Sequence, residues 1–342
     1  MKFFKFYIGE GVLRIFNIRA NLAIFLSLLI ISIFTMYALN AVNNFHKYNQ
    51  VVEGNLELTA DRLHFLIKNE FKKDWVKLTA SEVVTDKESQ LTTFKIMVKQ
   101  DDIDSLNVDL PESGKDHYVD AFMHVSDKKN KTFKVKLRYR GDNSFHWLFT
   151  QKSLRIKLSE DDSYNMSKVI NLINPPMLMQ IRDVISYEIA KELGLISPEY
   201  YPVRVFVNGE YMGVYLFLSQ VDESLLRSHK VMPGSIYYGE SSPVNENGIF
   251  DLFFKQQFWQ KKGARNKETK NLREDISYYI ESTNNLKPVD FYNFVNTSIN
   301  KPNYFSYIAL DRFTGTNHHD YGHNHKLYFD PYKGKFEPIV WD

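Results

Sequence analysis

The chain has 342 residues, a formal net charge of +2 and no cysteine. Its length accommodates one large domain or two smaller ones, and 26 Phe and 21 Tyr residues can supply a sizeable core. The near-neutral charge argues against a nucleic-acid partner, because such binding depends on neutralising phosphates. The absence of cysteine excludes disulfides, thiolate zinc sites and a cysteine nucleophile.

An uncharged segment, residues 20–39, follows a basic N-terminus at residues 1–19 and is rich in Leu, Ile and Phe. Twenty helical residues span the hydrocarbon core of a bilayer, so we predict a transmembrane helix at 20–39 with the lipid bilayer as its partner. A cleaved signal peptide or a buried helix is the alternative, but a signal peptide has a shorter apolar core and a small-residue cleavage site. No Lys or Arg follows until Lys47. The positive-inside rule therefore predicts a single-pass protein with a cytoplasmic N-terminus and an extracytoplasmic main domain.

The polar segment 40–57 is predicted to connect this helix to a folded domain. Leu58–Val76 carries apolar residues at helical spacing, which predicts a short amphipathic helix. Residues 101–116 are predicted to form a loop. Alternation of apolar and polar residues predicts strands at Thr92–Val98, Tyr118–Val125, Thr132–Arg140 and Lys152–Leu158.

The last of these strands is rich in basic residues. The two-residue period of a strand places Arg155 and Lys157 on one face, opposite Leu154, Ile156 and Leu158. If the polar face lines a cleft, its cations can bind the phosphates of a nucleotide. A solvated edge strand with basic side chains is the alternative interpretation.

A helix and a hairpin follow. Met179–Leu193 has Ile or Leu at four-residue spacing, and Gly194 follows as a C-terminal cap, which predicts a helix. Asn208-Gly209 separates two alternating segments, Tyr201–Val207 and Tyr211–Leu218. Because Asn-Gly is the preferred dipeptide of a type I′ turn, this is the clearest hairpin of the chain.

The C-terminal part is predicted to be mainly helical. Ser235–Phe254 is expected to contain strand and loop, and the basic run Gln256–Lys270 is expected to be a solvated face. Apolar spacing predicts helices at Val221–His229, Asn271–Ser282, Val289–Ile299 and Tyr304–Thr314.

The last stretch, residues 311–342, combines a polar loop with two short strands around an Asp-Pro turn. This arrangement is expected to bring Asp320, Asn324 and Asp342 close to one point. Carboxylate and amide oxygens of this kind suit Mg²⁺ that is held partly by substrate phosphates.

These motifs together resemble the CotH (spore coat protein H) kinases, an atypical protein-kinase-like family. The family pattern has an Asp, a loop ending in His-Asn, a Leu-Tyr strand, an Asp-Pro turn with Gly-Lys-Phe, and a closing Trp-Asp. The matching positions near the end are Asp320, His323-Asn324, Leu327-Tyr328, Asp330-Pro331, Gly334-Lys335-Phe336 and Trp341-Asp342. The matching positions upstream are Leu137–Gly141, Lys152–Lys157, Ile181-Arg182-Asp183 and Val207–Tyr215. The likeness extends from roughly Phe94 to Asp342, and the ordered set of motifs carries it.

The resemblance implies an α+β, protein-kinase-like two-lobe architecture after the transmembrane helix. Its small lobe, with an N-terminal extension, occupies residues 58–220 and consists mainly of antiparallel strands with the helix Met179–Leu193. Its large lobe occupies residues 221–342, is helical, and is expected to be incomplete at Asp342.

The implied activity is transfer of the γ-phosphate of ATP to a hydroxyl group of a protein substrate, with Mg²⁺ or Mn²⁺ as the metal. Asp320 is the candidate that orients the acceptor hydroxyl and takes its proton. Asn324 and Asp342 are the candidates that hold the metal.

Three further residues are candidates for the nucleotide site. Lys152 or Lys157 is expected to bind phosphate, and Glu188 of the helix is expected to pair with that lysine. The chain has no Gly-rich nucleotide loop of the usual kinase type and no Walker A motif. The phosphates must therefore be covered in another way.

Two other functions remain open. The first is a non-catalytic pseudokinase or cell-envelope scaffold. The second is a metal-dependent hydrolase, because His319 and His323 are four residues apart within a loop that holds four histidines.

Overall fold

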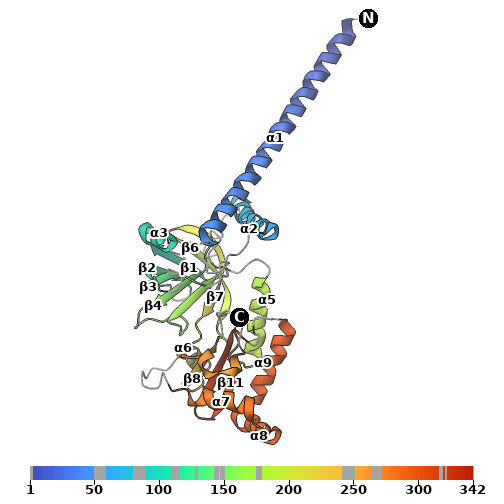
Figure 1. The fold of residues 1–342 in the computed structure, drawn as a ribbon. Helices are drawn as coiled ribbons and strands as arrows, with labels where there is room; N and C mark the ends of the chain where they lie inside the picture. The colour runs from blue at the N-terminus through green and yellow to red at the C-terminus, as the bar shows by residue number, and fades with distance from the viewer. Residues whose placement is uncertain are drawn as a thin grey trace.

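The computed structural model has two units, a β-barrel and a C-terminal unit, with a long helix projecting from the barrel (Figure 1). It describes residues 3–49, 59–79, 89–108, 116–127, 130–141, 146, 151–174, 179–240, 251–262, 272–315, 319 and 322–341.

The barrel closes in the order β1-β2-β3-β4-β5-β7-β6. Neighbouring strands are antiparallel except β1 and β6, which pair in parallel and close the barrel. Apolar residues alternate with polar ones along β2, β3 and β4, so that one side of each strand fills the interior. The strands are β1 (Thr93–Val98), β2 (Val119–Ser126), β3 (Lys131–Tyr139), β4 (Leu154–Leu158), β5 (Val169–Ile173), β6 (Tyr200–Val207) and β7 (Glu210–Ser219).

The C-terminal unit contains a four-stranded antiparallel sheet in the order β11-β10-β8-β9. Helices α7, α8 and α9 accompany this sheet, and aromatic residues such as Tyr279, Phe294 and Phe336 form the core between them. The elements are α6 (Glu223–Ser228), β8 (Ser235–Gly239), β9 (Trp259–Lys262), α7 (Glu274–Asn285), α8 (Pro288–Ser298), α9 (Lys301–Thr314), β10 (His325–Asp330) and β11 (Lys335–Pro338), with short 3-10 turns at Leu252–Phe254 and Gln256–Phe258.

The predicted protein-kinase-like two-lobe architecture is therefore wrong. The strands expected to form an open antiparallel sheet close into a barrel, because β1 pairs in parallel with the distant strand β6. The part expected to be a helical large lobe is organised around a sheet. Residues 101–116, expected to be a loop, begin with helix α3 (Gln100–Val108).

Several local predictions are confirmed. The predicted helices in the C-terminal part correspond to α6, α7, α8 and α9, and Met179–Leu193 corresponds to α5 (Met179–Glu192). However, the Ile and Leu residues at four-residue spacing do not form the buried face of α5. Ile181 and Ile185 are exposed, whereas Tyr187 and Ala190 pack against the barrel and α9.

The N-terminal region forms two helices at one end of the barrel. Helix α1 (Phe3–Asn49) is continuous through the predicted membrane segment and the first part of the predicted connector. Its segment Arg19–Asn43 is long and apolar enough to cross a membrane, and none of the most apolar part is buried. Ala41, near the end of this segment, and Phe45, just after it, enter the barrel's core cluster, and α2 (Ala60–Thr79) packs beside them.

Asn208 ties the predicted hairpin to the closure of the barrel. Asn208 and Gly209 have φ angles of 50° and 85°, as a type I′ turn requires. The side-chain amide of Asn208 donates to the Val98 carbonyl (2.8 Å) and accepts from the Val98 N–H (2.9 Å). Its backbone N–H also donates to the Ile96 carbonyl. One side chain therefore extends the β1–β6 ladder by a further pair of bonds.

We predict that Asn208→Gly lowers the free energy of unfolding by about 1–3 kcal/mol, since both Val98 groups lose their partner. Glycine retains the positive φ of the turn, so the loss reports the side-chain bonds. Thermal and urea unfolding measure the change. A difference below about 0.3 kcal/mol would show that the Asn208 bonds do not stabilise the closure.

Candidate functional site

A row of polar residues crosses three strands on the outer wall of the barrel. Arg138 of β3 lies opposite Arg155 of β4, and Arg155 lies opposite Asn171 of β5. The apolar residues of β4 face the interior, as the sequence predicted, so Arg155 points outward. The C-terminal unit lies next to this part of the wall (Figure 1), and Asn171 is completely buried.

The two guanidinium groups have unused hydrogen-bond donors. Within the described part of the chain, the Nε atoms of Arg138 and Arg155 are buried and have no hydrogen-bond partner. Arg138 donates from Nη1 to the Tyr139 carbonyl (3.0 Å) and lies over the ring of Tyr118 at 5.3 Å. Like charges directly opposite each other in an antiparallel pair are destabilising, and Arg138 accordingly lowers the pKa of Arg155. Two adjacent cations with free Nε–H groups form a site suited to an anion.

The electrostatics of Arg155 agree with this assignment. Burial lowers the pKa of Arg155; Tyr118 opposes the shift, and Arg138 adds to it. Arginine nevertheless stays protonated in proteins. The lowered pKa therefore marks a cation in an unfavourable environment, which a bound anion would relieve.

Asn171 and Gln220 connect the row to the C-terminal unit. The Asn171 side chain donates to the Leu218 carbonyl (3.2 Å) and to Oε1 of Gln220 (3.4 Å). Its own Oδ1 is buried without a partner among the described residues. Gln220 donates to the hydroxyl of Tyr238 (3.0 Å), which donates in turn to the Val221 carbonyl. Burial raises the pKa of Tyr238, so its hydroxyl remains a neutral donor and acceptor.

A buried lysine, Lys326, lies beside this network. Lys326 is opposite Tyr238 in the β8–β10 ladder. Its Nζ atom is 4.3 Å from the centre of the Tyr238 ring and 4.5 Å from that of Trp341. Such cation–π contacts offset part of the free energy lost on burying an ammonium group. Strand β10 thus brings a further cation to the Tyr238 ring.

His319 contacts two other parts of the chain. Its Nδ1 lies 2.8 Å from Oδ1 of Asp311 at the end of α9, and its Nε2 contacts the carbonyl oxygen of Trp341. Both ring nitrogens are therefore engaged by groups of the protein itself.

This arrangement gives no support to the His-metal alternative. Among the described residues, no three His, Asp or Glu side chains are grouped so that they could hold a metal ion. His323 lies 4.0 Å from Glu240. His319 has the structural role described above.

The residues predicted from the sequence fall into three groups. Asp320 and Asp342 lie outside the described residues. Asn324 is half-buried directly before β10 and has a φ of 61°, so it starts the strand from a left-handed backbone conformation. The residues predicted for the nucleotide site are Lys152, Lys157 and Glu188.

Lys152 and Lys157 lie on either side of the arginine pair. Lys157 is exposed on the outward side of β4, and Lys152 lies 5.8 Å from the ring of Tyr139. Glu188 is exposed on α5. The neighbouring Tyr187 stacks on Tyr200 of β6, with ring centres 4.5 Å apart.

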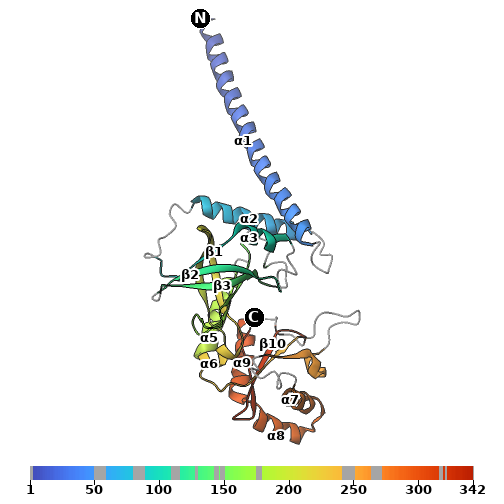
Figure 2. The ribbon, with the colours of Figure 1, turned by 90° about the vertical axis from the view of Figure 1, so that its left-hand side faces the viewer.

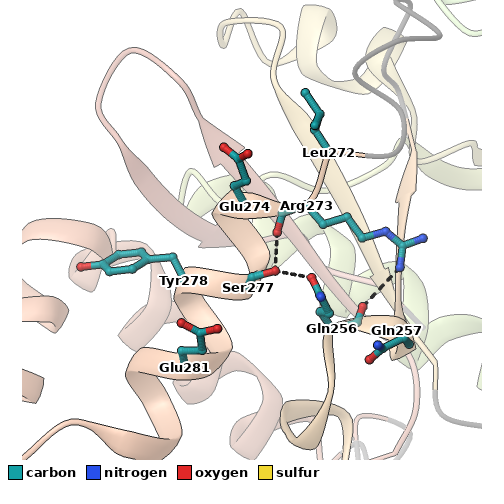
Figure 3. Close-up of a pocket in the computed structure, with 8 residues that line it drawn as sticks. All are labelled: Gln256, Gln257, Leu272, Arg273, Glu274, Ser277, Tyr278 and Glu281. Carbon is teal, nitrogen blue, oxygen red and sulfur yellow. Dashed lines mark hydrogen bonds between the residues drawn. The ribbon is translucent and has the colours of Figure 1, made fainter.

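A separate hollow of about 680 Å³ lies on the C-terminal unit (Figure 3). Its polar groups bond to one another: Ser277 contacts Oε1 of Gln256, and Arg273 lies 3.5 Å from the Gln256 carbonyl. Glu274 and Glu281 also line it, which disfavours an anion. The arginine pair is therefore the stronger candidate for a phosphate site.

Comparison with known proteins identifies the family to which the chain's motifs belong. The family model described as "CotH kinase protein" matches residues 137–342, more than half of the chain, so the chain belongs to the CotH family. The chain is also 28% identical over 262 residues to "Inner spore coat protein H" of Bacillus subtilis (strain 168). That match covers 75% of this chain and 68% of the relative.

The sequence analysis placed Arg155 on a polar face whose cations could bind phosphates, but it did not select Arg138, Tyr238 or Lys326. The sequence does contain one indication, because Arg138 and Arg155 each alternate with apolar residues in a motif that resembles the family. Their direct opposition depends on the β3–β4 register, and the approach of Tyr238 depends on how the two units pack.

We predict that Arg155→Met leaves the free energy of unfolding unchanged, or raises it by about 1 kcal/mol, in buffer without multivalent anions. Methionine retains the aliphatic packing while it removes an unpartnered donor and the repulsion with Arg138. Lys157→Met, an exposed position on the same side of the same strand, serves as the matched control and should stay within about 0.5 kcal/mol. Thermal unfolding measures both. A loss above about 1 kcal/mol for Arg155→Met alone would mean that Arg155 stabilises the empty fold.

Proposed function

We propose that this CotH-family protein is a kinase that transfers the γ-phosphate of ATP to a hydroxyl group of a protein substrate. The single observation that carries the proposal is the pair of opposed arginines with unused, buried Nε–H donors. Guanidinium groups bind phosphate oxygens with two parallel hydrogen bonds, and such charge-assisted bonds are about twice as strong as neutral ones. The family description, which names a kinase, supports the same chemistry.

In this proposal Arg138 and Arg155 bind phosphate oxygens of the nucleotide. Asn171 and Gln220 hold the arginine row against the C-terminal unit through Tyr238. Lys326 adds positive potential at the same junction. Phosphoryl transfer requires positioning and charge neutralisation more than covalent help, and these residues supply both.

Lys152 and Lys157 remain the competing candidates for the phosphate ligand. Both belong to the same motif as Arg155. The exposure of Lys157 favours the arginines over that lysine. Substitutions at each position distinguish the candidates.

The divalent metal, Mg²⁺ or Mn²⁺, is proposed to bind at the start of β10. Asn324 offers an amide oxygen, a ligand type that hard cations accept, and Asp342 would complete the protein's share. When bound, the metal supplies charge neutralisation between the phosphates. Asp320 is proposed to orient the acceptor hydroxyl and to take its proton.

Helix α1 is proposed to anchor the protein in a membrane, with a cytoplasmic N-terminus and the barrel outside the cytoplasm. The apolar length of Arg19–Asn43 and the basic residues before it support this topology. The relative's name refers to the inner spore coat. We propose a cell-envelope location for this chain as well.

Binding of Mg·ATP and Mn·ATP to the full chain in nanodiscs tests the proposal by calorimetry. Arg155→Met is expected to weaken binding about 10- to 100-fold, because it removes charge-assisted bonds of roughly 1.5–3 kcal/mol. Lys157→Met is expected to change the affinity less than about threefold, since an exposed cation contributes little. Equal affinities for wild type and Arg155→Met would overturn the arginine assignment, and loss of binding in Lys157→Met or Lys152→Met would restore the lysines.

Transfer from radiolabelled ATP to the chain itself or to casein tests catalysis. Asp320→Asn is expected to retain ATP binding and to lower the rate at least about 100-fold, the typical contribution of a positioned base. Binding of nucleotide by the wild type without any transfer would identify a pseudokinase. Transfer at an unchanged rate in Asp320→Asn would remove Asp320 from its proposed role.

A further inference from the structure

Helix α2 has a position that neither the membrane helix nor the proposed kinase site explains. Figure 2 shows α2 lying across the end of the barrel from which α1 projects, with its axis transverse to that of α1. The C-terminal unit lies on the other side of α2 from the projecting part of α1 (Figures 1 and 2). A bilayer that surrounds α1 would therefore approach α2 before any part of the C-terminal unit.

The helix has one face packed in the protein and another that is apolar but exposed. Leu66 is buried in the core cluster, and Leu63 and Ile67 pack against it. Phe71 and Trp75 are 43% and 57% exposed, and their rings stack with centres 6.2 Å apart. Two large aromatic side chains in adjacent turns thus form one exposed patch.

Contacts with α1 fix the position of this exposed patch relative to the predicted membrane-spanning segment. The hydroxyl of Tyr37 donates to Asp74 (2.5 Å), and the ring of Tyr37 meets that of Phe71 edge-on at 5.7 Å. Tyr37 is two residues before the end of the uncharged segment 20–39, about 3 Å along a helix that rises 1.5 Å per residue. Phe71 therefore lies level with the end of the membrane-spanning segment. Trp and Tyr are enriched at this level in membrane proteins.

The charge of α2 adds a second argument. Its sequence contains five basic residues, Arg62, Lys68, Lys72, Lys73 and Lys77, against three acidic ones, Asp61, Glu70 and Asp74. Asp74 is engaged with Tyr37. Basic residues at a membrane surface are attracted by anionic lipids. A helix with exposed aromatic residues and surplus basic ones has the composition of an interfacial helix.

We propose that α2 lies in the headgroup region of an anionic bilayer, with Phe71 and Trp75 inserted among the lipids. The inference rests on the proposed anchoring by α1 and adds a second contact. Because Ala41 and Phe45 also fix α1 to the barrel core, the two contacts set the tilt of the barrel on the membrane. The phosphate site is then held at a constant height above the surface.

The test uses the full chain in vesicles of phosphatidylcholine, with or without phosphatidylglycerol. The vesicles also contain lipids that are brominated on the upper acyl chain and quench tryptophan fluorescence. Trp75→Phe is expected to remove most of the lipid-dependent quenching of tryptophan fluorescence. The control Trp75→Phe/Tyr332→Trp places an exposed tryptophan on the β10–β11 turn, where Tyr332 is 83% exposed, and should not restore quenching. Quenching of the wild type is expected to increase with phosphatidylglycerol.

Flotation of the vesicles separates failure of the inference from failure of the anchor. Co-flotation with Trp75-dependent quenching supports the inference. Co-flotation with equal quenching in wild type and Trp75→Phe overturns the contact by α2 and leaves the α1 anchor intact. A chain that does not float with vesicles overturns both.

Discussion

The parallel pairing of β1 with β6 is the constraint on which the rest of the structure depends. It closes the barrel, and the two bonds between Asn208 and Val98 extend it. Closure gives every strand one interior and one exterior side. The apolar residues of β4 fill the interior, so Arg155 has to lie outside, beside Arg138. The C-terminal unit then lies next to this part of the wall, where Arg138 and Arg155 are half-buried and Asn171 is buried.

The fold holds two cations, Arg138 and Arg155, side by side in an electrostatically unfavourable arrangement. Arg138 and Arg155 lie directly opposite each other in the β3–β4 ladder, and like charges in such a position are destabilising. The described residues supply no carboxylate to either guanidinium, and both Nε atoms lack a partner. Local conflicts of this kind concentrate at functional sites, where a ligand resolves them. A phosphate group would supply both the missing acceptors and the missing negative charge.

Local features were predictable from the sequence, and long-range ones were not. Asn208-Gly209 specifies its turn chemically, and the periodicity of Met179–Leu193 specifies a helix. Alternation, however, is the same in an open sheet and in a closed barrel, so it could not reveal the pairing of Phe94 with Val205. Strands β8 and β9 are short and join through partners distant in sequence, which made the C-terminal part resemble a helical lobe. The face of Arg155 was predicted, but its pairing with Arg138 was missed, because alternation does not specify the register of neighbouring strands.

The position of the phosphate groups tests the account most directly. A crystal structure of the full chain with Mg²⁺ and a non-hydrolysable ATP analogue would show it. The account predicts phosphate oxygens within hydrogen-bonding distance, about 3 Å, of the Nε atoms of both Arg138 and Arg155. Phosphates bound instead at Lys152 or Lys157, with the two Nε atoms still without partners, would contradict it.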